Sequence, residues 1–561
     1  MDLLETILAS RGLLGDDRDA FLNPIYESKH DPFLLPDMEK AVNRLILAQK
    51  KQHKITIYGD YDIDGLTATT LLLDALESFG FKDVEAFIPN RFVEGYGLTV
   101  DAVEQIAAKG AQLIITVDCG SLSEKEIVRA NELGVDVIVT DHHNVAPIQP
   151  PAIAVINPKR LLADYPDEYD GYVLKNNSKK RNEIYPFLDL AGVGVAFKLV
   201  QAMQTKMDGL EAGQEKWLLD LVALGTVCDV VNLTNENRAN VYWGLKVLAK
   251  TRRQGLKALM KVANVTPENL TARSLGFGLG PRMNAAGRLE TAQHSLDMLR
   301  ATDSRKATVF AEKLDVMNTT RKSEQAKIVE EAMLQAEQYA KDNVLVVSSE
   351  GWSHGIIGIV AAKLLETFKK PVFVLEEMGE EAKGSARSYG DFSAADAIRA
   401  AEEFVTKGGG HRYAAGVTLP TTNISKFREA VNEFYRAQKL FNQDELLLSR
   451  EDAVVSLDHV TEELIEDLAR LEPFGNGNPE PILSSQNLRV FYKKAMGANE
   501  QHVKLGLQDL NGRKFYMIAF GAPDHFYVEP GERVTVWYRP TINEWQGRRS
   551  VEGQLLRLER A

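Results

Sequence analysis

The sequence is poor in cysteine and has no long apolar run. Two cysteines among 561 residues cannot form a disulfide framework, which suits a reducing compartment. The longest apolar stretches, such as 355–362, are far shorter than the roughly 18 residues that cross a bilayer. The N-terminus carries Asp2 and Glu5 where a signal peptide needs Lys or Arg. We therefore expect a cytoplasmic protein.

Glycine and proline are also too scarce for a collagen-like or disordered chain. There are 41 glycines and 20 prolines, and 44% of the residues are hydrophobic, enough for several packed cores. Basic residues are also fewer than acidic ones, and the net charge is −13. That total argues against a protein that coats duplex DNA, but it leaves room for a local basic groove. It also suits a site where carboxylates surround metal ions, and composition leaves both alternatives open.

The first half of the chain predicts helices followed by a parallel sheet. Residues 1–50 carry apolar residues at helical spacing. Across 51–235, short β-branched runs alternate with helix-like stretches, the pattern of βαβ units and a mostly parallel α/β sheet. The polar segment 165–186 interrupts this domain, and we expect it to be an exposed loop.

The second half predicts a connector and two further domains. Residues 236–342 look mainly helical, and the charged stretch from Asp303 onward suits a long connecting helix. Strand and helix patterns alternate again over 343–440, which predicts a second α/β domain. Residues 451–561 turn to short strands typical of a small β-barrel.

Three carboxylates directly follow the first predicted strand, ITIY. Asp60, Asp62 and Asp64 are spaced at i, i+2 and i+4, so they point to one side if the chain is still extended. Clustered acids repel one another and need a cation or a specific network. The alternative is an Asp-rich turn that leads into a helix N-terminus, where Asp is favoured. The segment alone does not decide between them.

Acids and imidazoles also follow two later strands. Asp118 ends one strand, and Asp141, His142 and His143 end the next. Open α/β sheets bind ligands at the carboxyl ends of their strands. A further acid, Asp229, follows an apolar helix. Carboxylates with imidazoles and no thiolate cluster suit Mn²⁺ or Mg²⁺, and several acids around two ions suit phosphoryl transfer.

Together these motifs resemble the DHH phosphoesterase superfamily: DYDIDG, VDCG, TDHH with Asn157-Pro158 downstream, and GTVCDVV. Later motifs narrow the resemblance to the RecJ family of bacterial single-strand-specific 5′→3′ DNA exonucleases: GPRMNAAGR (280–288), SHGIIGIVAAKL (353–364), GSARS (384–388), GGGHRYAAG (408–416) and PFGNGNPEP (473–481). The resemblance covers nearly the whole chain. It implies a parallel-sheet DHH catalytic domain, a long connecting helix, a second α/β domain of the DHHA1 type and an OB-like barrel.

The resemblance also implies two divalent ions, Mn²⁺ or Mg²⁺, with five protein ligands. By the family pattern, Asp118 bridges the ions and Asp62 serves one of them. The other ion would be held by Asp64, His142 and Asp229. His143 would contact the scissile phosphate, and Asp60 would be an orienting residue or a ligand through water. One departure is Tyr58, which stands where some members of the superfamily have a histidine ligand.

Substrate contacts are expected in three places, and each has a plain structural alternative. Residues expected along the path of the strand are Arg282, Asn284 and Arg288, which could instead be helix-surface residues. Residues expected to hold phosphate are His354, Ser385, Arg387, Gly409, Gly410 and His411, although a glycine run can be a mere flexible turn. Residues expected to bind DNA on the barrel are Trp537, Arg539 and Trp545, although such aromatics are more often core.

The function implied is hydrolysis of single-stranded DNA to mononucleotides from the 5′ end, in DNA repair and recombination. The family further implies a single-strand-binding protein and a helicase as partners, and we expect a monomer and no membrane association. One alternative is a phosphoesterase of the same superfamily acting on small nucleotides, which would need neither barrel nor arginine-rich helix. Another is a noncatalytic nucleic-acid scaffold, which the full set of acids disfavours.

Both cysteines stand beside predicted ligands. Cys119 follows Asp118, and Cys228 precedes Asp229. A small buried filler is the simple interpretation of each. The sharper hypothesis is that oxidation of these thiols, or capture of a soft metal nearby, disorders the site.

Overall fold

The structure is a computed structural model that describes residues 3–26, 29–438, 451–545 and 547–560. The chain forms two compact units. The main unit contains residues 31–229 and 244–448, and the barrel unit contains residues 1–30, 230–243 and 449–561. The helices expected within residues 1–50 are therefore divided between the two units. The domain boundaries expected from the sequence stay a prediction.

A five-stranded sheet forms the centre of the first half of the main unit, in the order β2-β1-β3-β4-β5. Every neighbouring pair in this sheet is parallel, which confirms the predicted parallel sheet. The strands are β1 (Ile55–Gly59), β2 (Val84–Phe87), β3 (Leu113–Val117), β4 (Asp136–Thr140) and β5 (Ala154–Ile156). Their continuous apolar runs are explained by burial of both faces.

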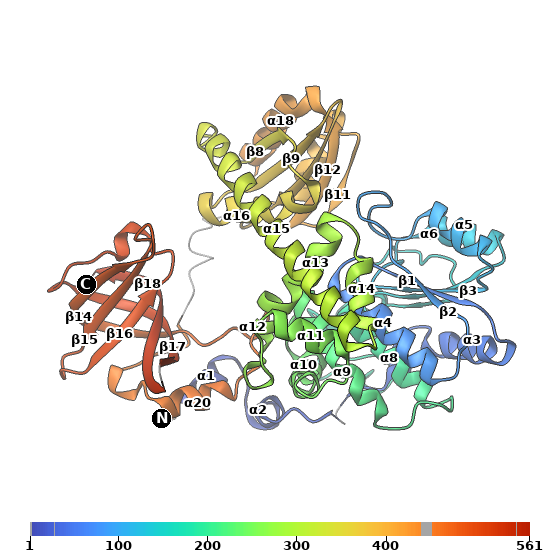
Figure 1. Cartoon of the computed structure of the whole chain (residues 1–561), viewed down its shortest axis with the longest axis horizontal. Coiled ribbons are helices and arrows are strands. Elements are labelled where there is room, and N and C mark those ends of the chain that lie inside the picture. Colours follow the sequence, from blue (N-terminus) through green and yellow to red (C-terminus); the bar gives the residue numbers. More distant parts are fainter. Residues whose placement is uncertain (1–2, 27–28, 439–450, 546, 561) are drawn as a thin grey trace. The chain divides into compact units, whose positions relative to one another are not determined.

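Helices cover both faces of this sheet (Figure 1). On one face, α5 (Val100–Ala108) and α6 (Glu124–Glu132) share an apolar core with strand residues such as Ile114 and Val137. On the other, α4 (Ile63–Ser78) packs against α8 (Gly192–Gln204) and α9 (Leu219–Cys228). The remaining helices of this half are α3 (Met38–Lys51) and α7 (Arg160–Asp164).

The segment 165–186 is not simply an exposed loop. It contains the hairpin of β6 (Tyr169–Asp170) and β7 (Val173–Leu174), and Ile184 and Tyr185 are buried. Its scattered apolar and aromatic side chains anchor a segment whose composition is otherwise polar. The expectation of a loop was wrong at these positions.

A run of helices leads to the second domain of the main unit. The run comprises α10 (Asn235–Leu248), α11 (Gln254–Val262), α12 (Ala272–Ser274), a π-helical turn (Leu275–Leu279), α13 (Gly280–Leu289), α14 (Gln293–Arg300) and α15 (Ser304–Gln338). Asp303 caps α15, since its carboxylate accepts the Lys306 N–H at 2.9 Å. The 35-residue α15 confirms the long connecting helix.

The second domain contains a mixed sheet in the order β11-β12-β10-β9-β8. Its strands are β8 (Leu345–Glu350), β9 (Val372–Met378), β10 (Glu381–Arg387), β11 (Lys407–Gly410) and β12 (Ala414–Pro420). Only the β8–β9 pair is parallel. Its helices are α16 (His354–Phe368), α17 (Ala394–Ala400) and α18 (Ile424–Ala437). Separate apolar cores join α16 to one side of the sheet and α17 with α18 to the other.

The barrel unit is built around strands that close on themselves, drawn in red in Figure 1. They are β13 (Ala453–Val454), β14 (Leu483–Met496), β15 (His502–Gln508), β16 (Lys514–Ala519), β17 (Arg533–Trp545) and β18 (Arg548–Arg560). Pairing of β14 with β17 closes a five-stranded barrel, as the sequence predicts. The helices α1 (Leu3–Ser10), α2 (Gly15–Leu22) and α20 (Glu462–Ala469) contribute leucines to its core. No helix in the described ranges combines the length and hydropathy needed to cross a bilayer.

Candidate metal centre and nucleic-acid interface

The Asp-rich motif lies at the turn from β1 into α4. Asp60 directly follows β1, and Asp62 is the N-cap of α4, where its carboxylate accepts the Gly65 N–H at 3.1 Å. Asp64 lies in the first helical turn. A Cβ on Gly65 would lie 2.5 Å from the Asp60 carbonyl oxygen, so this turn requires glycine. The conditional expectation of three acids along an extended segment is therefore wrong, and the turn into a helix N-terminus is what the chain adopts.

The remaining predicted ligands come from three other element ends. Asp118 directly follows β3 and has a φ of 61°, a left-handed conformation that Asp tolerates better than most residues. His142 and His143 follow β4, and Asp229 is the C-cap of α9. The carboxyl edge of the parallel sheet thus gathers side chains from distant parts of the sequence.

All seven side chains that we expected around the ions or the scissile phosphate lie in overlapping groups. Within each group the candidate ligand atoms lie within 4.8 Å of one another. The groups are Asp60 with Asp62 and Asp118, Asp64 with His142 and Asp229, and Asp118 with His142 and His143. Asp118 and His142 each occur in two groups, so the arrangement offers adjacent sites that share a ligand.

Several polar atoms of this cluster are buried with no hydrogen-bond partner among the described residues. They are Asp60 Oδ1, Asp118 Oδ1, His142 Nε2 and Asp229 Oδ2. The imidazole nitrogen lies 3.1 Å from Asp118 Oδ1 and 3.6 Å from Asp229 Oδ2. Unpaired buried acceptors are costly, and a divalent cation would satisfy several of them at once. Carboxylate oxygens with one imidazole fit Mn²⁺ or Mg²⁺.

Burial makes the acids difficult to ionise. It raises the pKa of Asp60, Asp118 and Asp229 well above the usual range, and repulsion from neighbouring carboxylates adds to the effect. Burial and the charge of Asp62 raise the pKa of Asp64 to about 7. Burial, with the charge of His143, lowers the pKa of His142 to about 3, which leaves a neutral imidazole able to bind a metal. The site is therefore electrostatically incomplete without added positive charge.

Backbone N–H groups fix Asp64 in place. Its two carboxylate oxygens accept the N–H of Gly192 at 2.6 Å and of Val193 at 2.8 Å, at the start of α8. A Cβ on Gly192 would lie 2.8 Å from the Asp118 carboxylate. Glycine at this position thus lets a helix N-terminus approach both acids.

Asp141 holds the histidine pair in position. Its carboxylate accepts the backbone N–H of His142 at 2.7 Å and of Ser121 at 2.9 Å. It also lies 2.9 Å from His143 Nδ1. Burial opposes ionisation of Asp141, but the bond and charge of His143 prevail and hold the pKa of Asp141 well below its usual range. Asp141 therefore orients the histidines and belongs to none of the candidate ligand groups.

His143 is the more accessible of the two histidines. Its side chain is 34% exposed, against 7% for His142. Burial acts to lower its pKa, but the hydrogen bond and charge of Asp141 raise the pKa overall. The Tyr96 hydroxyl lies 3.2 Å from His143 Nδ1. A partly exposed imidazole with a raised pKa, beside the acid cluster, suits contact with a phosphate. Sequence reasoning missed Tyr96, although the glycines on both sides of it mark a specialised loop.

Four arginines with no described ion pair lie close enough to one another, and to Asp62 of the acid cluster, for their charges to interact. They are Arg91, Arg288, Arg321 and Arg387. Burial and the charges of the other three lower the pKa of Arg288 to about 10. The Nε atoms of Arg91 and Arg321 are buried and lack a described hydrogen-bond partner. This arginine cluster is a local concentration of positive charge in a chain of net charge −13. Of its members, only Arg288 and Arg387 were predicted.

The other predicted contacts of the main unit lie in different surroundings. His354 Nδ1 lies 2.9 Å from Glu376, and the ring packs edge-on to Phe92. Ser385 Oγ accepts a hydrogen bond from Arg387 at 3.1 Å. The exposed His411 Nδ1 lies 3.3 Å from the Asn144 amide, which follows His143. Gly409 and Gly410 are exposed on β11, and Asn284 is half-buried on α13. Arg282 differs from the arginine cluster, because its guanidinium pairs with Asp315 at 2.7 Å.

Two of the residues expected to bind DNA on the barrel, Trp537 and Arg539, have partners within the barrel unit. Trp537 is only 9% exposed, its indole N–H donates to Glu451 at 2.9 Å, and Arg557 covers its ring. Arg539 pairs with Glu480 at 3.4 Å. Trp545 ends β17, and its side chain lies outside the described residues. Trp537 offers no stacking face, because its side chain on β17 is buried and Arg557 lies over its ring.

A different aromatic surface lies on β14, β15 and β16. Tyr492 and Tyr516 are 38% and 39% exposed, and their rings meet edge-on with centroids 6.1 Å apart. Phe491 packs against Tyr516, and Lys514 lies 5.0 Å above the Phe491 ring. Lys504 lies 5.1 Å from the Tyr516 ring. These five residues, here called the barrel patch, combine exposed rings with lysines.

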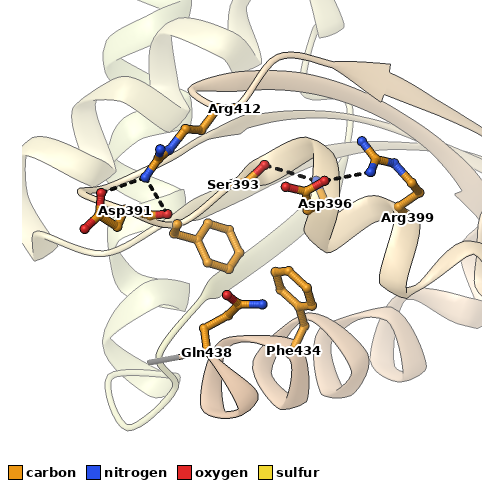
Figure 2. Close-up of a pocket in the computed structure, with 8 residues that line it drawn as sticks. Asp391, Ser393, Asp396, Arg399, Arg412, Phe434 and Gln438 are labelled. Atoms are coloured by element: carbon orange, nitrogen blue, oxygen red, sulfur yellow. Dashed lines mark hydrogen bonds and ion pairs between the residues drawn. The ribbon is translucent and has the colours of Figure 1, made fainter. Parts of the chain in front are cut away.

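The second domain also has a pocket of about 520 Å³ beside α17 and α18 (Figure 2). Its charged side chains pair with each other: Arg412 donates to Asp391 at 2.7 Å, and Arg399 lies 2.8 Å from Asp396. The ion pairs balance the charge of the pocket, in contrast to the arginine cluster. We assign it no part in the site.

Both cysteines are inert in this setting. Cys119 belongs to the apolar core of the sheet. The Cys228 thiol donates to the Leu275 carbonyl at 3.8 Å. Burial raises the pKa of both thiols, so little reactive thiolate forms at neutral pH. With Cys119 buried and Cys228 half-buried, the structure favours packing roles over an oxidation-sensitive pair.

Comparison with family models matches three successive parts of the chain. The N-terminal domain of the DHH family matches residues 54–226, the DHHA1 domain matches 341–437, and the RecJ OB domain matches 451–556.

Similar proteins match over most of the chain. A single-stranded-DNA-specific exonuclease RecJ of Bacillus subtilis is 35% identical over 98% of this chain and 67% of its own length. The protein of the same name from Escherichia coli is 34% identical over 92% of this chain and 89% of its own.

Crystal structures of RecJ from Thermus thermophilus match the fold. The structure in complex with Mn²⁺ has a TM-score of 0.82 and 28% identity, and covers 99% of this chain and 76% of that one. The structure in complex with Mg²⁺ has a TM-score of 0.76 and 26% identity, and covers 99% and 74%. The ions in these complexes are those that the donor set here suits.

Proposed function

Because this chain belongs to the RecJ family of single-stranded-DNA-specific exonucleases, we propose that it hydrolyses single-stranded DNA with two divalent ions. The observation that carries the proposal is the set of three ligand groups, which Asp118 and His142 link to one another, with the arginine cluster nearby. The acids suit the ions, and the arginines suit the strand. Cleavage from the 5′ end to mononucleotides, in DNA repair and recombination, is what the family resemblance adds.

The residues proposed to hold the ions are those of the two groups that contain at least two acids. Asp62 and Asp118 would hold one ion, with Asp60 as a ligand or an orienting residue. Asp64, His142 and Asp229 would hold the other, and the family pattern adds that both ions would share Asp118. Mn²⁺ or Mg²⁺ bound there supplies the Lewis acidity that phosphodiester hydrolysis needs. Gly192, Val193 and Asp141 keep the acids and imidazoles oriented.

The histidine and arginine donors are proposed to bind the substrate phosphates. His143 is proposed to donate to a non-bridging oxygen of the scissile phosphate, held by Asp141 on one side and Tyr96 on the other. Arg288, Arg387 and Ser385 are proposed to hold the backbone or the terminal phosphate, and Arg91 and Arg321 join them. His354, Gly409, Gly410, His411 and Asn284 stay predicted contacts.

The barrel is proposed to bind single-stranded DNA as well. Its binding surface is the barrel patch, in place of Trp537 and Arg539. A cytoplasmic location, a monomeric state and docking of a single-strand-binding protein or a helicase stay proposals from the family and the sequence.

The test is a product assay on a single-stranded oligonucleotide that carries a different label at each end. We expect Mn²⁺-dependent release of the 5′ label as a mononucleotide, abolished by EDTA and by Asp118→Ala. Dinucleotide and pyrophosphate are assayed in parallel. Hydrolysis of those small substrates without attack on the long strand would point to the small-nucleotide alternative. Metal-independent binding with no hydrolysis at all would point to the scaffold.

A further inference from the structure

The motif that follows the fifth strand has no role in the proposed site. Strand β5 runs parallel to β4 and ends at Ile156, so its carboxyl end lies at the sheet edge that carries the acid cluster. Asn157 and Pro158 come next, and Lys159 then leads into α7. Because parallel sheets bind ligands at this edge, the fold delivers Lys159 to the substrate side of the domain.

Asn157 fixes the backbone of Lys159 beside that of His143. The buried side-chain amide of Asn157 donates to the His143 carbonyl at 2.8 Å and to the Ser121 hydroxyl at 2.8 Å. Its amide oxygen accepts the Lys159 N–H at 2.9 Å. One buried side chain therefore ties Lys159 to the histidine that is proposed to contact the scissile phosphate.

The Lys159 ammonium lies near several acids but pairs with none of them. It is close enough to Asp141, Asp189 and Asp229 for their charges to interact with its own. Within the part of the chain that the structure describes, Lys159 nevertheless forms no ion pair. Burial lowers the pKa of this half-buried lysine, and the charges of the acids oppose the effect. A partly desolvated cation of this kind gains from an anionic ligand.

The Tyr172 ring supports this lysine from the neighbouring hairpin. Lys159 Nζ lies 5.4 Å from the centroid of the ring, within the range of a cation–π contact. Tyr172 occupies the turn between β6 and β7, and its backbone carbonyl accepts the Leu188 N–H at 2.8 Å. The hairpin within the polar segment 165–186 thus places an aromatic face beside Lys159.

Lys159 belongs to a different part of the site from the arginine cluster. Asp62 is the acid among the main charges that act on Arg288, but it is not among the main charges that act on Lys159. The charge of Lys159 acts instead on His143. Lys159 is therefore a cation on the histidine side of the acid cluster, in addition to the arginines.

We propose that Lys159 binds the backbone phosphate that directly follows the scissile one on its 3′ side. The inference rests on the proposed function, in which His143 contacts the scissile phosphate and the arginine cluster holds the strand toward its 5′ end. A strand that crosses the acids in this order carries its next phosphate past His143 to the unpaired ammonium. The contact needs at least three nucleotides, because a dinucleotide has no phosphate at that position.

The first test compares a 5′-phosphorylated dinucleotide with the corresponding trinucleotide as substrates of the full-length protein with Mn²⁺. Lys159→Gln is expected to raise KM for the trinucleotide about tenfold relative to its effect on the dinucleotide. Lys159→Arg keeps the charge and should recover most of that loss. An equal effect of Lys159→Gln on the two substrates would overturn the proposal.

Lys180 provides a matched control in the same domain. It also lies over a tyrosine ring, at 4.7 Å from the centroid of Tyr165, but it pairs with Glu183 at 3.7 Å. Lys180→Gln should therefore leave KM unchanged for both substrates. A length-dependent rise in KM in this variant as large as that in Lys159→Gln would show that loss of any lysine causes it, and would contradict a specific contact.

A neutral methylphosphonate in the strand tests the same contact without altering the protein. Placed directly 3′ of the scissile phosphate, it should raise KM for the first cut by the unaltered protein about tenfold. The same strand should raise KM of Lys159→Gln by less than about twofold, because the charge that it would lose there has no partner. Equal penalties in the two proteins would show that Lys159 does not meet this phosphate.

Two outcomes separate this inference from the proposed function. No hydrolysis of any strand by the unaltered protein with Mn²⁺ would refute the proposed function, and the inference with it. Normal hydrolysis with the same KM for the trinucleotide in Lys159→Gln would refute the Lys159 contact alone. If Lys159 served only to balance the buried acids, Lys159→Gln would strengthen Mn²⁺ binding in a calorimetric titration and would affect both substrates alike, which also contradicts the proposal.

Discussion

Asp118 is the residue that we propose both candidate ion sites to share. It is 1% exposed, has a positive φ, and lies in two of the three ligand groups. Glycine at 192 leaves just enough room for its carboxylate. In the metal-free chain Asp118 lowers the free energy of unfolding, because its buried carboxylate is surrounded by other carboxylates.

Replacing Asp118 should therefore raise the stability of the metal-free protein and lower its activity. Asp118→Asn removes a charge whose pKa is strongly raised by burial and by Asp64. We expect the metal-free variant to unfold at a higher temperature at pH 8. We also expect the rate of hydrolysis to fall more than about 100-fold. This loss is larger than the one caused by removing a residue that only orients a ligand. Thermal melts and single-strand cleavage are the measurements, and near-normal turnover would contradict the bridging role.

The raised pKa of Asp64 predicts how metal binding depends on pH. Its folded pKa is about 7, above the value near 4 of an unfolded chain, so the folded metal-free protein binds the extra proton. Its contribution to stability therefore declines as pH rises from about 4 to 7. Metal must displace that proton, so Mn²⁺ affinity should rise with pH through about pH 7.

Melting temperatures with and without Mn²⁺ between pH 5.5 and 8.5 measure this effect. The stabilisation by Mn²⁺ should grow with pH over the lower part of the range. Asp64→Asn should flatten the dependence in metal-free protein. A Mn²⁺ effect that is larger at pH 5.5 than at 8 would have the wrong sign.

At the scale of elements, the sheet was the easier part to predict. Continuous β-branched runs indicated the strands, and parallel order then put Asp118 and His142 at one edge. The path after Asp60 was not predictable in this way. It depends on Asp62 capping α4 and on a contact between Gly65 and the Asp60 backbone, which no period of the sequence reveals.

The arginine cluster was harder still, because its members come from four separate parts of the fold. Arg91 lies in a loop, Arg288 on α13, Arg321 on α15 and Arg387 on β10. An isolated arginine in a sequence gives no sign of whether a carboxylate will meet it. Arg282 illustrates the difficulty, since it is six residues from Arg288 yet pairs with Asp315.

That contrast yields a matched pair of substitutions. Arg321→Ala removes an unpaired cation, so affinity for single-stranded DNA should fall and its salt dependence should become shallower by about one phosphate contact. Arg282→Ala removes a cation whose charge Asp315 already balances. This substitution should change the affinity and the salt dependence far less. Fluorescence anisotropy over a salt series in EDTA measures binding without cleavage. Equal effects of the two variants would argue against the arginine cluster as the path of the strand.

For the whole molecule, net charge is a poor guide to the partner. An acidic total coexists with a local group of unpaired arginines, and the acids that make up part of that total surround the candidate metal site. The barrel shows the same limit for aromatic residues. The sequence pattern singles out Trp537, which is buried, whereas the exposed rings Tyr492 and Tyr516 were not singled out.

The barrel patch should matter for long substrates only. Tyr516→Ala removes a stacking face worth about 1–3 kcal/mol per base, so binding of a long oligonucleotide should weaken at least fivefold. Dinucleotide hydrolysis should be unchanged. Trp537→Phe is the control. It should lower the melting temperature and leave the affinity for the long oligonucleotide nearly unchanged. A larger affinity loss in Trp537→Phe would restore Trp537 as part of the binding surface.

The most direct test of the account is a crystal structure with Mn²⁺, measured at the manganese absorption edge. The account predicts two anomalous peaks on either side of the Asp118 carboxylate. One peak should be bound by Asp62, and the other by Asp64, His142 and Asp229. A single peak, or peaks that do not share Asp118, would contradict the two-ion site.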